Sequence, residues 1–371
     1  MTGKLLASKK ETGLQIEEIE VPGYEKILKV TEAKSKLKAL IAIHNTVLGP
    51  ALGGIRIFPY ASLDLALEDV LRLARGMTYK SAVAEVGFGG GKSVIMADPQ
   101  KDKTEALLCA FGRAVECLKG KYICAEDVGC SVKDVGVIRK ETKYVVGLAH
   151  EKSSGNPAPF TAWGTFRGIQ SALKKVFGSD SLEGKTVALQ GVGSVGEVLA
   201  ELLFWHGARV TIADINQAKV AELQHKFGFK AVAVEQIFQE ECDVFAPCAM
   251  GGIINDKTLP HLKCRIVAGC ANNQLLKPEN GEALKARRIL YVPDFVINAG
   301  GLINVAHETE KRGYHPQSAR NKTNQIYDVL TSIYEIAEKK QISTSRAALE
   351  LGDYRLKYGV GKRSVEPYFH H

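Results

Sequence analysis

Two lysines near a run of glycines are the residues whose types and spacing most favour chemistry in this chain. Lys80 ends the run 77–80, and Lys92 directly follows the glycines at 89–91. Adjacent glycines let a backbone bend and approach a small ligand. One ammonium group could then bind a carboxylate, and the second could act as a base if burial and its like-charged neighbour lower its pKa. A surface loop with two solvated lysines is the alternative, and the stretch alone does not decide between them.

The same stretch ends like a phosphate-binding P-loop, at Gly91-Lys92-Ser93. That motif requires a glycine five residues before Gly91, where this chain has Val86. Its lysine and serine also begin a helix, whereas 93–97 has the apolar pattern of a strand. The sequence therefore argues against a nucleoside triphosphatase.

A second glycine motif is typical of dinucleotide binding: Gly191-Val192-Gly193-Ser194-Val195-Gly196. It follows an expected strand at 186–190 and begins an expected helix at 194–206. The first glycine permits a tight turn, the second lets the backbone reach a pyrophosphate, and the third lets the helix pack on the strand. Backbone N–H groups at the helix start then hold the phosphates.

The identity of the dinucleotide follows from one acid. Asp214 ends the next expected strand, where an acid can bind the ribose 2′-hydroxyl and repel a 2′-phosphate. The sequence therefore predicts NAD rather than NADP. A plain strand–turn–helix with a capping aspartate is the alternative.

Alternating strands and helices must position these motifs, and they predict an α/β protein of two domains. The first, 1–150, would have a mixed sheet and serve substrate binding and oligomerisation. The second, 151–340, would be a Rossmann-like NAD-binding domain, after a proline-rich hinge at 153–159. Helices at 326–340 and 344–357 are long enough to pack back on the first domain, which we assign 341–371.

Composition excludes several classes of protein. The chain has 371 residues, of which 45% are hydrophobic and 24% charged, and no apolar run approaches the roughly 20 residues of a membrane span. The first twenty residues are too polar for a signal peptide, so we expect a cytoplasmic protein. The net charge of +8 comes from interleaved charges, which argues against nucleic acid as a partner. The eight cysteines form no CxxC pair, so we expect reduced thiols and no metal.

Several further motifs occur together in one order. They occupy 48–54, 71–80, 89–92, 125–129, 271–273 and 298–301. In this the chain resembles the amino-acid dehydrogenases of the Glu/Leu/Phe/Val family, and most of all the members that act on leucine, from about Ile41 to Ala337. The resemblance implies an NAD-dependent enzyme and a homo-oligomer. The stretch 352–365 departs from the family pattern, so subunit number stays open.

The resemblance also implies roles for the residues of these motifs. Lys80 would bind the substrate α-carboxylate, Lys92 would be the general base that activates water, and Asp127 would exchange protons with the amino group and water. Further substrate contacts would come from Asn273, Gly53, Gly54 and Met77. Cofactor contacts besides the glycine motif and Asp214 would come from Thr161, Ile215, Cys248, Ala249, Asn273 and Asn298.

The chemistry agrees with these roles. Oxidative deamination passes a hydride to the nicotinamide and leaves an iminium that water must attack, so the reaction needs a base and a group that moves a proton to nitrogen. From the residues alone, Asp127 could equally be a helix cap or a surface acid, because it precedes a helix-like stretch at 131–140.

Four aliphatic residues match the side-chain pocket of the family: Leu52, Ala125, Leu302 and Val305. Such a lining excludes a charged substrate tail, because an unpaired buried carboxylate is costly. We therefore expect leucine, valine and isoleucine as substrates, with phenylalanine or tryptophan as the alternative. Simple core packing would also explain these four residues.

Two other functions remain to be weighed. A catalytically silent NAD-binding regulator would keep the glycine motif, but the joint presence of Lys80, Lys92, Asp127 and Asn273 argues against it. A 2-hydroxy-acid dehydrogenase would need a histidine–aspartate pair as its base, which the scattered histidines do not suggest.

Overall fold

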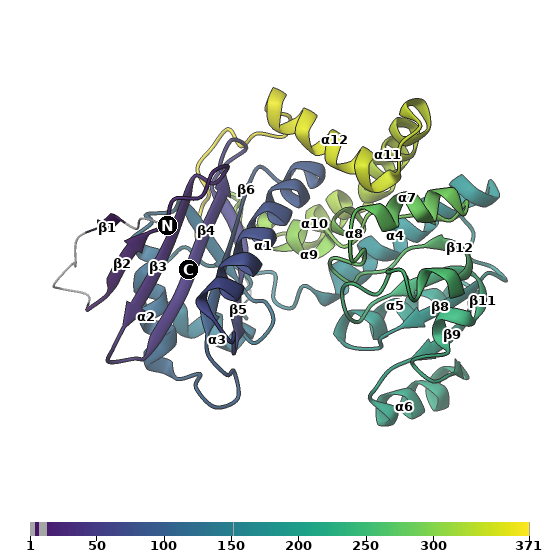
Figure 1. Ribbon diagram of the computed structural model, residues 1–371, viewed down its shortest axis with the longest axis horizontal. Coiled ribbons are helices and arrows are strands. Elements are labelled where there is room, and N and C mark those ends of the chain that lie inside the picture. Colours follow the sequence, from purple (N-terminus) through teal and green to yellow (C-terminus); the bar gives the residue numbers. More distant parts are fainter. Residues whose placement is uncertain (1–3, 7–12, 151, 371) are drawn as a thin grey trace. The chain divides into compact units, whose positions relative to one another are not determined.

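The chain folds into two compact units. The computed structural model describes residues 4–6, 13–150 and 152–370 (Figure 1). The first unit comprises the described residues up to Asn156, Val305–Pro316 and those from Asp353 onward. The second comprises Pro157–Asn304 and Gln317–Gly352. These limits differ from the expected domain boundaries, because a helical pattern does not tell which core a helix packs on.

The first unit contains a seven-stranded mixed sheet, in the order β1-β2-β3-β4-β6-β5-β7. Strands β1 to β4 and β6 pair antiparallel, whereas β5 pairs in parallel with both β6 and β7. The predicted mixed sheet is confirmed. The strands are β1 (Lys4–Leu6), β2 (Gln15–Glu18), β3 (Lys26–Glu32), β4 (Leu37–Asn45), β5 (Ala51–Phe58), β6 (Gly89–Met96) and β7 (Tyr122–Ala125).

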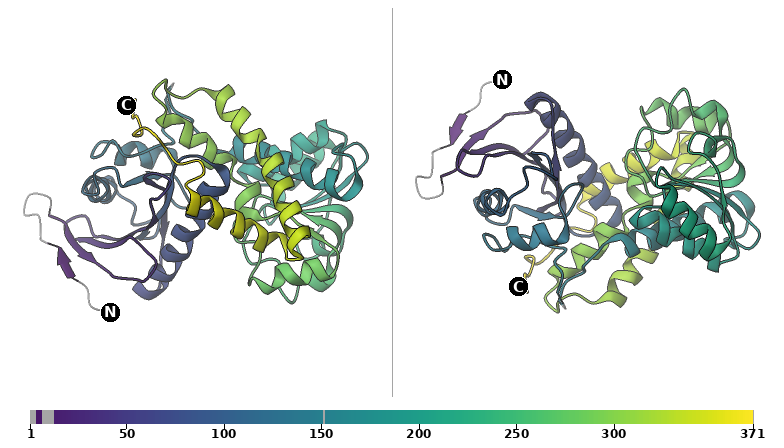
Figure 2. Two further views of the ribbon diagram at one scale, coloured as in Figure 1. Left: turned by 90° about the horizontal axis from the view of Figure 1, so that it is seen from above. Right: turned by 90° about the horizontal axis from the view of Figure 1, so that it is seen from below.

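Helices cover both faces of this sheet. Helix α1 (Leu63–Ala84) packs on the face that carries Leu40 and Ala42. Helices α2 (Glu105–Glu116) and α3 (Val132–Ile138) pack on the opposite face, and all three views show α1 and α2 on opposite sides (Figures 1 and 2). Because successive residues of a strand point to opposite faces, β4 is apolar on both and reads as one continuous apolar run.

The glycine-rich stretch is a strand and not a flexible loop. Strand β6 begins at Gly89, four residues before the strand expected at 93–97. A Cβ on Gly90 would lie 2.1 Å from the backbone nitrogen of Thr78 on α1, and one on Gly89 would lie 2.0 Å from the carbonyl oxygen of Asn45. These glycines therefore let α1 and the neighbouring backbone approach β6, which corrects the expectation that they make room for a ligand.

The second unit contains a six-stranded parallel sheet, in the order β10-β9-β8-β11-β12-β13. Numbered within this unit the order is 3-2-1-4-5-6, the order of a dinucleotide-binding fold, so the Rossmann-like prediction is confirmed. The strands are β8 (Thr186–Gln190), β9 (Arg209–Ala213), β10 (Lys230–Ala231), β11 (Glu241–Pro247), β12 (Lys263–Val267) and β13 (Leu290–Tyr291).

The remaining helices belong mainly to the second unit. Helix α11, which the sequence suggested could reach the first domain, packs on α4 instead, where Gly168 of α4 leaves room for Leu330. The helices are α4 (Ala158–Phe177), α5 (Ser194–Trp205), α6 (Gln217–Phe227), α7 (Glu279–Ala286), α8 (Asp294–Ile297), α9 (Gly300–Ala306), α10 (Pro316–Asn324), α11 (Ile326–Lys340) and α12 (Thr344–Tyr358). Among the described residues, no helix is both long and apolar enough to span a bilayer.

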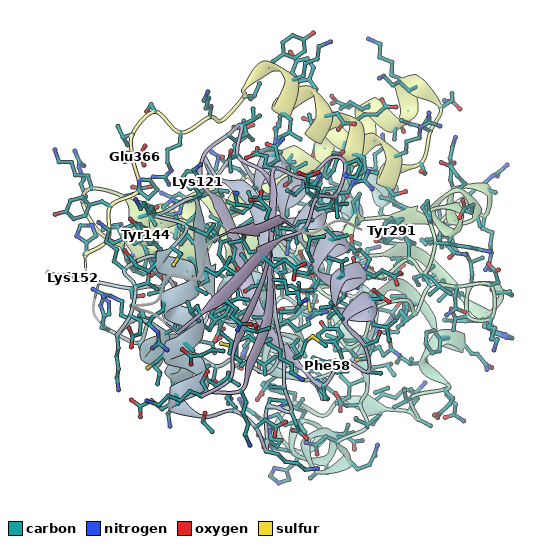
Figure 3. The ribbon with its side chains drawn as sticks, turned by 60° about the vertical axis from the view of Figure 1, so that its left-hand side comes forward. Phe58, Lys121, Tyr144, Lys152, Tyr291 and Glu366 are labelled. Carbon is teal, nitrogen blue, oxygen red and sulfur yellow. The ribbon has the colours of Figure 1, made fainter. Side chains whose placement is uncertain are left out.

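The C-terminal segment packs on the first unit, as the sequence suggested for the end of the chain. The Arg363 guanidinium donates to the carbonyl oxygen of Gly87 at 3.1 Å and to Thr309 Oγ1 at 3.0 Å. Near the end of the chain, the ring of Phe369 packs edge-on against Tyr144 at 5.5 Å between centroids (Tyr144 is labelled in Figure 3). Hydrogen bonds thus hold the C-terminal segment next to Gly87, just before β6.

Candidate active site

The centre of the first unit's site lies where β5, β6 and β7 run side by side. In Figure 3, the label Lys121 marks the residue before β7 and the label Phe58 marks the last residue of β5. Strand β7 ends beside Gly54, and the chain continues along β5, where the Ile57 N–H donates to the carbonyl oxygen of Val128 at 2.9 Å. This path carries Asp127 over the middle of β5, next to the neighbouring strand β6.

Lys92 and Asp127 meet as an ion pair. Lys92 Nζ lies 2.6 Å from Asp127 Oδ2, and their side chains are 7% and 21% exposed. The lysine is therefore a buried partner of an acid and not a solvated surface residue. The acid is the more exposed partner of the pair. Two residues predicted to carry the chemistry are thus in direct contact.

Glycine makes this contact sterically feasible. A Cβ on Gly54 would lie 2.8 Å from Asp127 Cβ and 3.1 Å from Lys92 Nζ. On Gly53 it would lie only 1.8 Å from the carbonyl oxygen of Gly91, so β5 and β6 could not pair as closely. Gly54 thus admits the ion pair and Gly53 the close pairing of β5 with β6, while the substrate contacts expected of both stay a prediction.

Positive charge sets the ionisation of Asp127. Burial alone would raise its pKa, but the charges of Lys92 and Arg56 outweigh burial and hold the pKa of this carboxyl below its usual range. The neighbouring Glu126 behaves oppositely, because burial and the Asp127 charge raise its pKa. Asp127 is not the cap of the following helix, since Ser131 caps α3 and Asp134 completes its capping box.

The other predicted substrate residues divide between the two units. Lys80 and Met77 are half-buried and three residues apart on α1, so they share a helix face. Leu52 and Ala125 are buried on the adjacent strands β5 and β7. Val305, also buried, lies in the first unit, whereas Leu302 and Asn273 belong to the second.

The glycine motif of the second unit begins at the end of β8. Gly191 has φ +95°, and a Cβ there would lie 2.8 Å from the backbone nitrogen of Ala249. Cys248 follows β11 and donates its N–H to the carbonyl oxygen of Gln190 at 2.7 Å. The two loops therefore meet where the order of the sheet reverses, which is where such sheets bind ligands.

The motif has the open space that a dinucleotide needs. Gly193 is the N-cap of α5, is exposed, and a Cβ there would meet no described atom within 4 Å. By contrast, a Cβ on Gly196 would lie 2.0 Å from the carbonyl oxygen of Gly191. Ser194 is also exposed, whereas Val192 is buried at 2%. Packing explains Gly196, whereas no packing contact within the described residues requires a glycine at 193.

Backbone hydrogen bonds hold Asp214 beside this motif. Its Oδ2 accepts the Val192 N–H at 2.7 Å, and its Oδ1 accepts the Asn216 N–H at 2.8 Å. The next residue, Ile215, is 87% exposed, which is unusual for a large apolar side chain. An acid fixed beside an exposed apolar surface suits the ribose and base of a nucleotide.

A third group of predicted cofactor residues surrounds the start of α4 and the segment before α9. Thr161 is half-buried, and a Cβ on Gly301 would lie 2.6 Å from its Oγ1. Asn298 is 3% exposed and donates to Asn272 Oδ1 at 2.7 Å, while its own Oδ1 is buried without a partner among the described residues. Asn273 is exposed with φ +52°. The unpaired amide oxygen fits a donor on a bound ligand.

Sequence reasoning missed Arg56. This arginine, 20% exposed, lies 3.4 Å through Nε from Asp127 Oδ2 and 2.9 Å through a terminal nitrogen from Asp69 Oδ2. A charged residue inside the apolar strand 51–58 was the available signal. It had no partner in the sequence pattern, because Asp69 and Asp127 come from α1 and the turn after β7.

Comparisons with known proteins found matches over most of the chain. A family profile described as the Glu/Leu/Phe/Val dehydrogenase dimerisation domain matches 26–144, and one for the Glutamate/Leucine/Phenylalanine/Valine dehydrogenases matches 211–357. The chain is similar to a leucine dehydrogenase of Geobacillus stearothermophilus, with 51% identity over 91% of this chain and 92% of that protein.

Two further relatives act on aromatic substrates by name. A phenylalanine dehydrogenase of Thermoactinomyces intermedius is 44% identical over 90% of this chain and 92% of its own. The crystal structure of the L-tryptophan dehydrogenase from Nostoc punctiforme superposes with a TM-score of 0.79 at 43% identity, covering 91% of this chain and 97% of that one.

Proposed function

Since the chain belongs to the Glu/Leu/Phe/Val dehydrogenase family and is therefore an amino-acid dehydrogenase, we propose that it oxidises leucine, valine and isoleucine with NAD. The amino acid gives a hydride to NAD, its nitrogen leaves as ammonium, and the oxygen of water remains in the 2-oxo acid. The observation that carries the proposal is the buried Lys92–Asp127 pair, at 2.6 Å.

The residues of the first unit would divide the work. Lys80 binds the α-carboxylate as a positive point charge. Lys92, when neutral, takes a proton from the water that attacks the substrate iminium carbon. The ionised Asp127 then takes up that proton from the protonated Lys92 and passes it to the nitrogen that leaves. NAD, when bound, accepts the hydride from Cα.

The residues of the second unit would hold NAD. The N–H groups from Gly193 to Gly196 bind the pyrophosphate, and Asp214 binds the ribose hydroxyls and repels a 2′-phosphate. Thr161, Asn273 and Asn298 bind at the nicotinamide end. The open space at Gly193 and the unpaired oxygen of Asn298 support this arrangement.

Aliphatic lining supports branched-chain substrates. Leu52 and Ala125 are buried on adjacent strands, and Leu302 and Val305 would complete the pocket. An aromatic substrate is the second candidate, favoured by relatives that carry phenylalanine and tryptophan in their names at 44% identity. A methylene is worth only about 1–3 kcal/mol in such a pocket, so related side chains should also react.

The direct test measures kcat/KM for leucine, valine, phenylalanine and glutamate, each with NAD and with NADP. We expect the highest value for a branched-chain amino acid with NAD and the lowest for glutamate. Preference for phenylalanine would favour the second candidate, and preference for glutamate would refute the pocket assignment. No NADH formation with any amino acid would point to the silent regulator.

The same proposal includes assembly and location. The family profile over 26–144 is described as a dimerisation domain, and β1 lies at an open edge of its sheet. We therefore propose a homo-oligomer. A location in the cytoplasm, a small-molecule substrate as partner and the lack of a metal remain expectations from the sequence.

A further inference from the structure

Arg56 occupies an unusual position for a charged residue. It lies in β5 between Ile55 and Ile57, both fully buried, in a strand that is paired on both sides. Burying a charge is costly unless partners compensate it. Two carboxylates do so here: Asp69 from α1 at 2.9 Å and Asp127 at 3.4 Å.

Asp69 is itself held from two further directions. Its Oδ2 accepts the Tyr60 hydroxyl at 2.6 Å, and its Oδ1 accepts a guanidinium N–H of Arg72 at 2.8 Å. Asp69 therefore has little freedom, and it fixes one edge of the Arg56 guanidinium. The Nε of the guanidinium lies 3.4 Å from Asp127 Oδ2, an ion pair without a hydrogen bond.

Lys92 and Arg56 approach the same oxygen of Asp127, its Oδ2. Among the described residues, the other titratable groups that act on Asp127 are Glu126, Tyr122 and Cys130. Burial raises the pKa of the Tyr122 hydroxyl and of the Cys130 thiol well above their usual ranges, so both are neutral near pH 7. Besides Lys92, Arg56 is thus the nearby positive charge.

The two cations differ in one essential respect. A lysine can lose its proton, and Lys92 must do so to act as a base. An arginine in a protein cannot be deprotonated in the working pH range. Once Lys92 is neutral, Asp127 would lose its counter-charge and would itself be favoured to take up the proton. A permanent neighbouring charge prevents that.

We propose that Arg56 is a positioning residue, which keeps Asp127 in place and ionised while Lys92 is neutral. This inference rests on the proposed function of Lys92 and Asp127. Asp69 is part of the same device because it fixes the guanidinium. Arg56 acts through Asp127 and makes no contact with substrate in this scheme.

The test compares the pH profile of kcat for the wild type and Arg56→Gln with a saturating branched-chain amino acid and NAD. Removal of the positive charge stabilises the neutral carboxyl, so the acid limb should move to higher pH. Loss of position should lower kcat at its optimum by roughly ten- to a hundredfold. KM for the amino acid should change little, because Arg56 does not touch it.

Arg113 offers a matched control in the same unit. It pairs with Glu32 at 2.8 Å and with Glu141 at 3.4 Å, which resembles the setting of Arg56 between its two acids. Arg113→Gln should lower the thermal midpoint and leave the pH profile unchanged. An unshifted profile in Arg56→Gln, or an equal shift in Arg113→Gln, would overturn the inference.

Two more variants keep the outcome decisive. If Arg56→Gln does not fold, Asp69→Asn can replace it, because that variant keeps the arginine but removes the carboxylate that holds it. Asp69→Asn should still lower kcat. A wild-type kcat in Asp69→Asn would contradict the positioning role. Asp127→Asn separates this inference from the proposed function. Loss of turnover in Asp127→Asn with normal behaviour of Arg56→Gln removes only the inference, whereas full turnover in Asp127→Asn removes the function assigned to the pair.

Discussion

At the scale of single residues, the site is an arrangement of charges around one carboxylate. Lys92 and Arg56 both face Asp127, and their attraction outweighs the effect of burial on its pKa. An ionised acid beside a lysine can receive and return a proton without solvent. The arrangement of Lys92, Arg56 and Asp127 therefore suits general acid–base chemistry, whichever amino acid is the substrate.

The first prediction concerns this carboxylate. Asp127→Asn keeps the shape of the side chain but removes its charge and its capacity to accept a proton. We expect kcat to fall by about 10²–10⁴, the usual contribution of a general acid or base. The Kd of NAD, measured by fluorescence titration, should stay within about twofold. Loss of folding instead of turnover would indicate a structural role.

At the scale of elements, glycines decide which backbones can approach one another. Gly90 lets α1 pack on β6, Gly54 admits the ion pair, and Gly196 lets α5 pack at the end of β8. Gly193 is different, because open space surrounds it. Glycines of one motif thus serve either the fold or a ligand, and their surroundings separate the two.

A second prediction tests packing between α1 and β6. In Gly90→Ala the new methyl would lie 2.1 Å from the Thr78 nitrogen, so backbone must shift, at a cost of about 1–3 kcal/mol in the free energy of unfolding. Gly76→Ala on the exposed side of α1 is the matched control, since its methyl meets nothing within 4 Å. It should be neutral or stabilise by up to about 1 kcal/mol. Thermal midpoints compare them, and equal midpoints would contradict the packing argument.

A third prediction separates the two uses of glycine in the NAD motif. Gly193→Ala should keep the thermal midpoint of the free protein and weaken NAD binding, because only the ligand needs that space. Gly196→Ala should lower the midpoint even without NAD, because its methyl would lie 2.0 Å from the Gly191 carbonyl oxygen. Binding titrations and melting curves of both variants provide the comparison. Unchanged NAD affinity in Gly193→Ala would oppose the proposed pyrophosphate site.

At the scale of the whole molecule, much of the architecture could be predicted from the sequence. The parallel sheet of the second unit was predictable because its strands are short apolar runs separated by helices, and the family resemblance is confirmed. The strands β2 and β3 were not predicted, because β2 is short and both strands are rich in charged residues. The return of 305–316 to the first unit was also missed, since it depends on packing and not on local pattern.

Individual residues of the site could be predicted from the sequence, but the contacts between them could not. Lys92, Asp127 and Gly54 belong to recognisable motifs, yet the reason for Gly54 emerges only once β5 lies beside the ion pair. Arg56 could not be connected to Asp127 from the sequence, because 71 positions separate them and only the sheet brings them together. Charge networks that join several elements carry no periodic signal.

A fourth prediction belongs to the assembly. We expect light scattering to give the mass of two or more chains, since the profile over 26–144 is described as a dimerisation domain. Dilution over the range of an activity assay should leave that mass unchanged. A mass equal to that of a single chain at these concentrations would contradict the predicted assembly.

The account as a whole depends on Lys92 as the base, so the most direct measurement is the turnover of Lys92→Ala with a branched-chain amino acid and NAD. We predict a loss of kcat of about 10²–10⁴ at the pH optimum, with the Kd of NAD close to that of the wild type. The thermal midpoint should fall, because the buried Asp127 loses one of its two positive partners, so turnover is measured well below the midpoint of the variant. Near-full turnover in this variant, with the fold intact, would contradict the account.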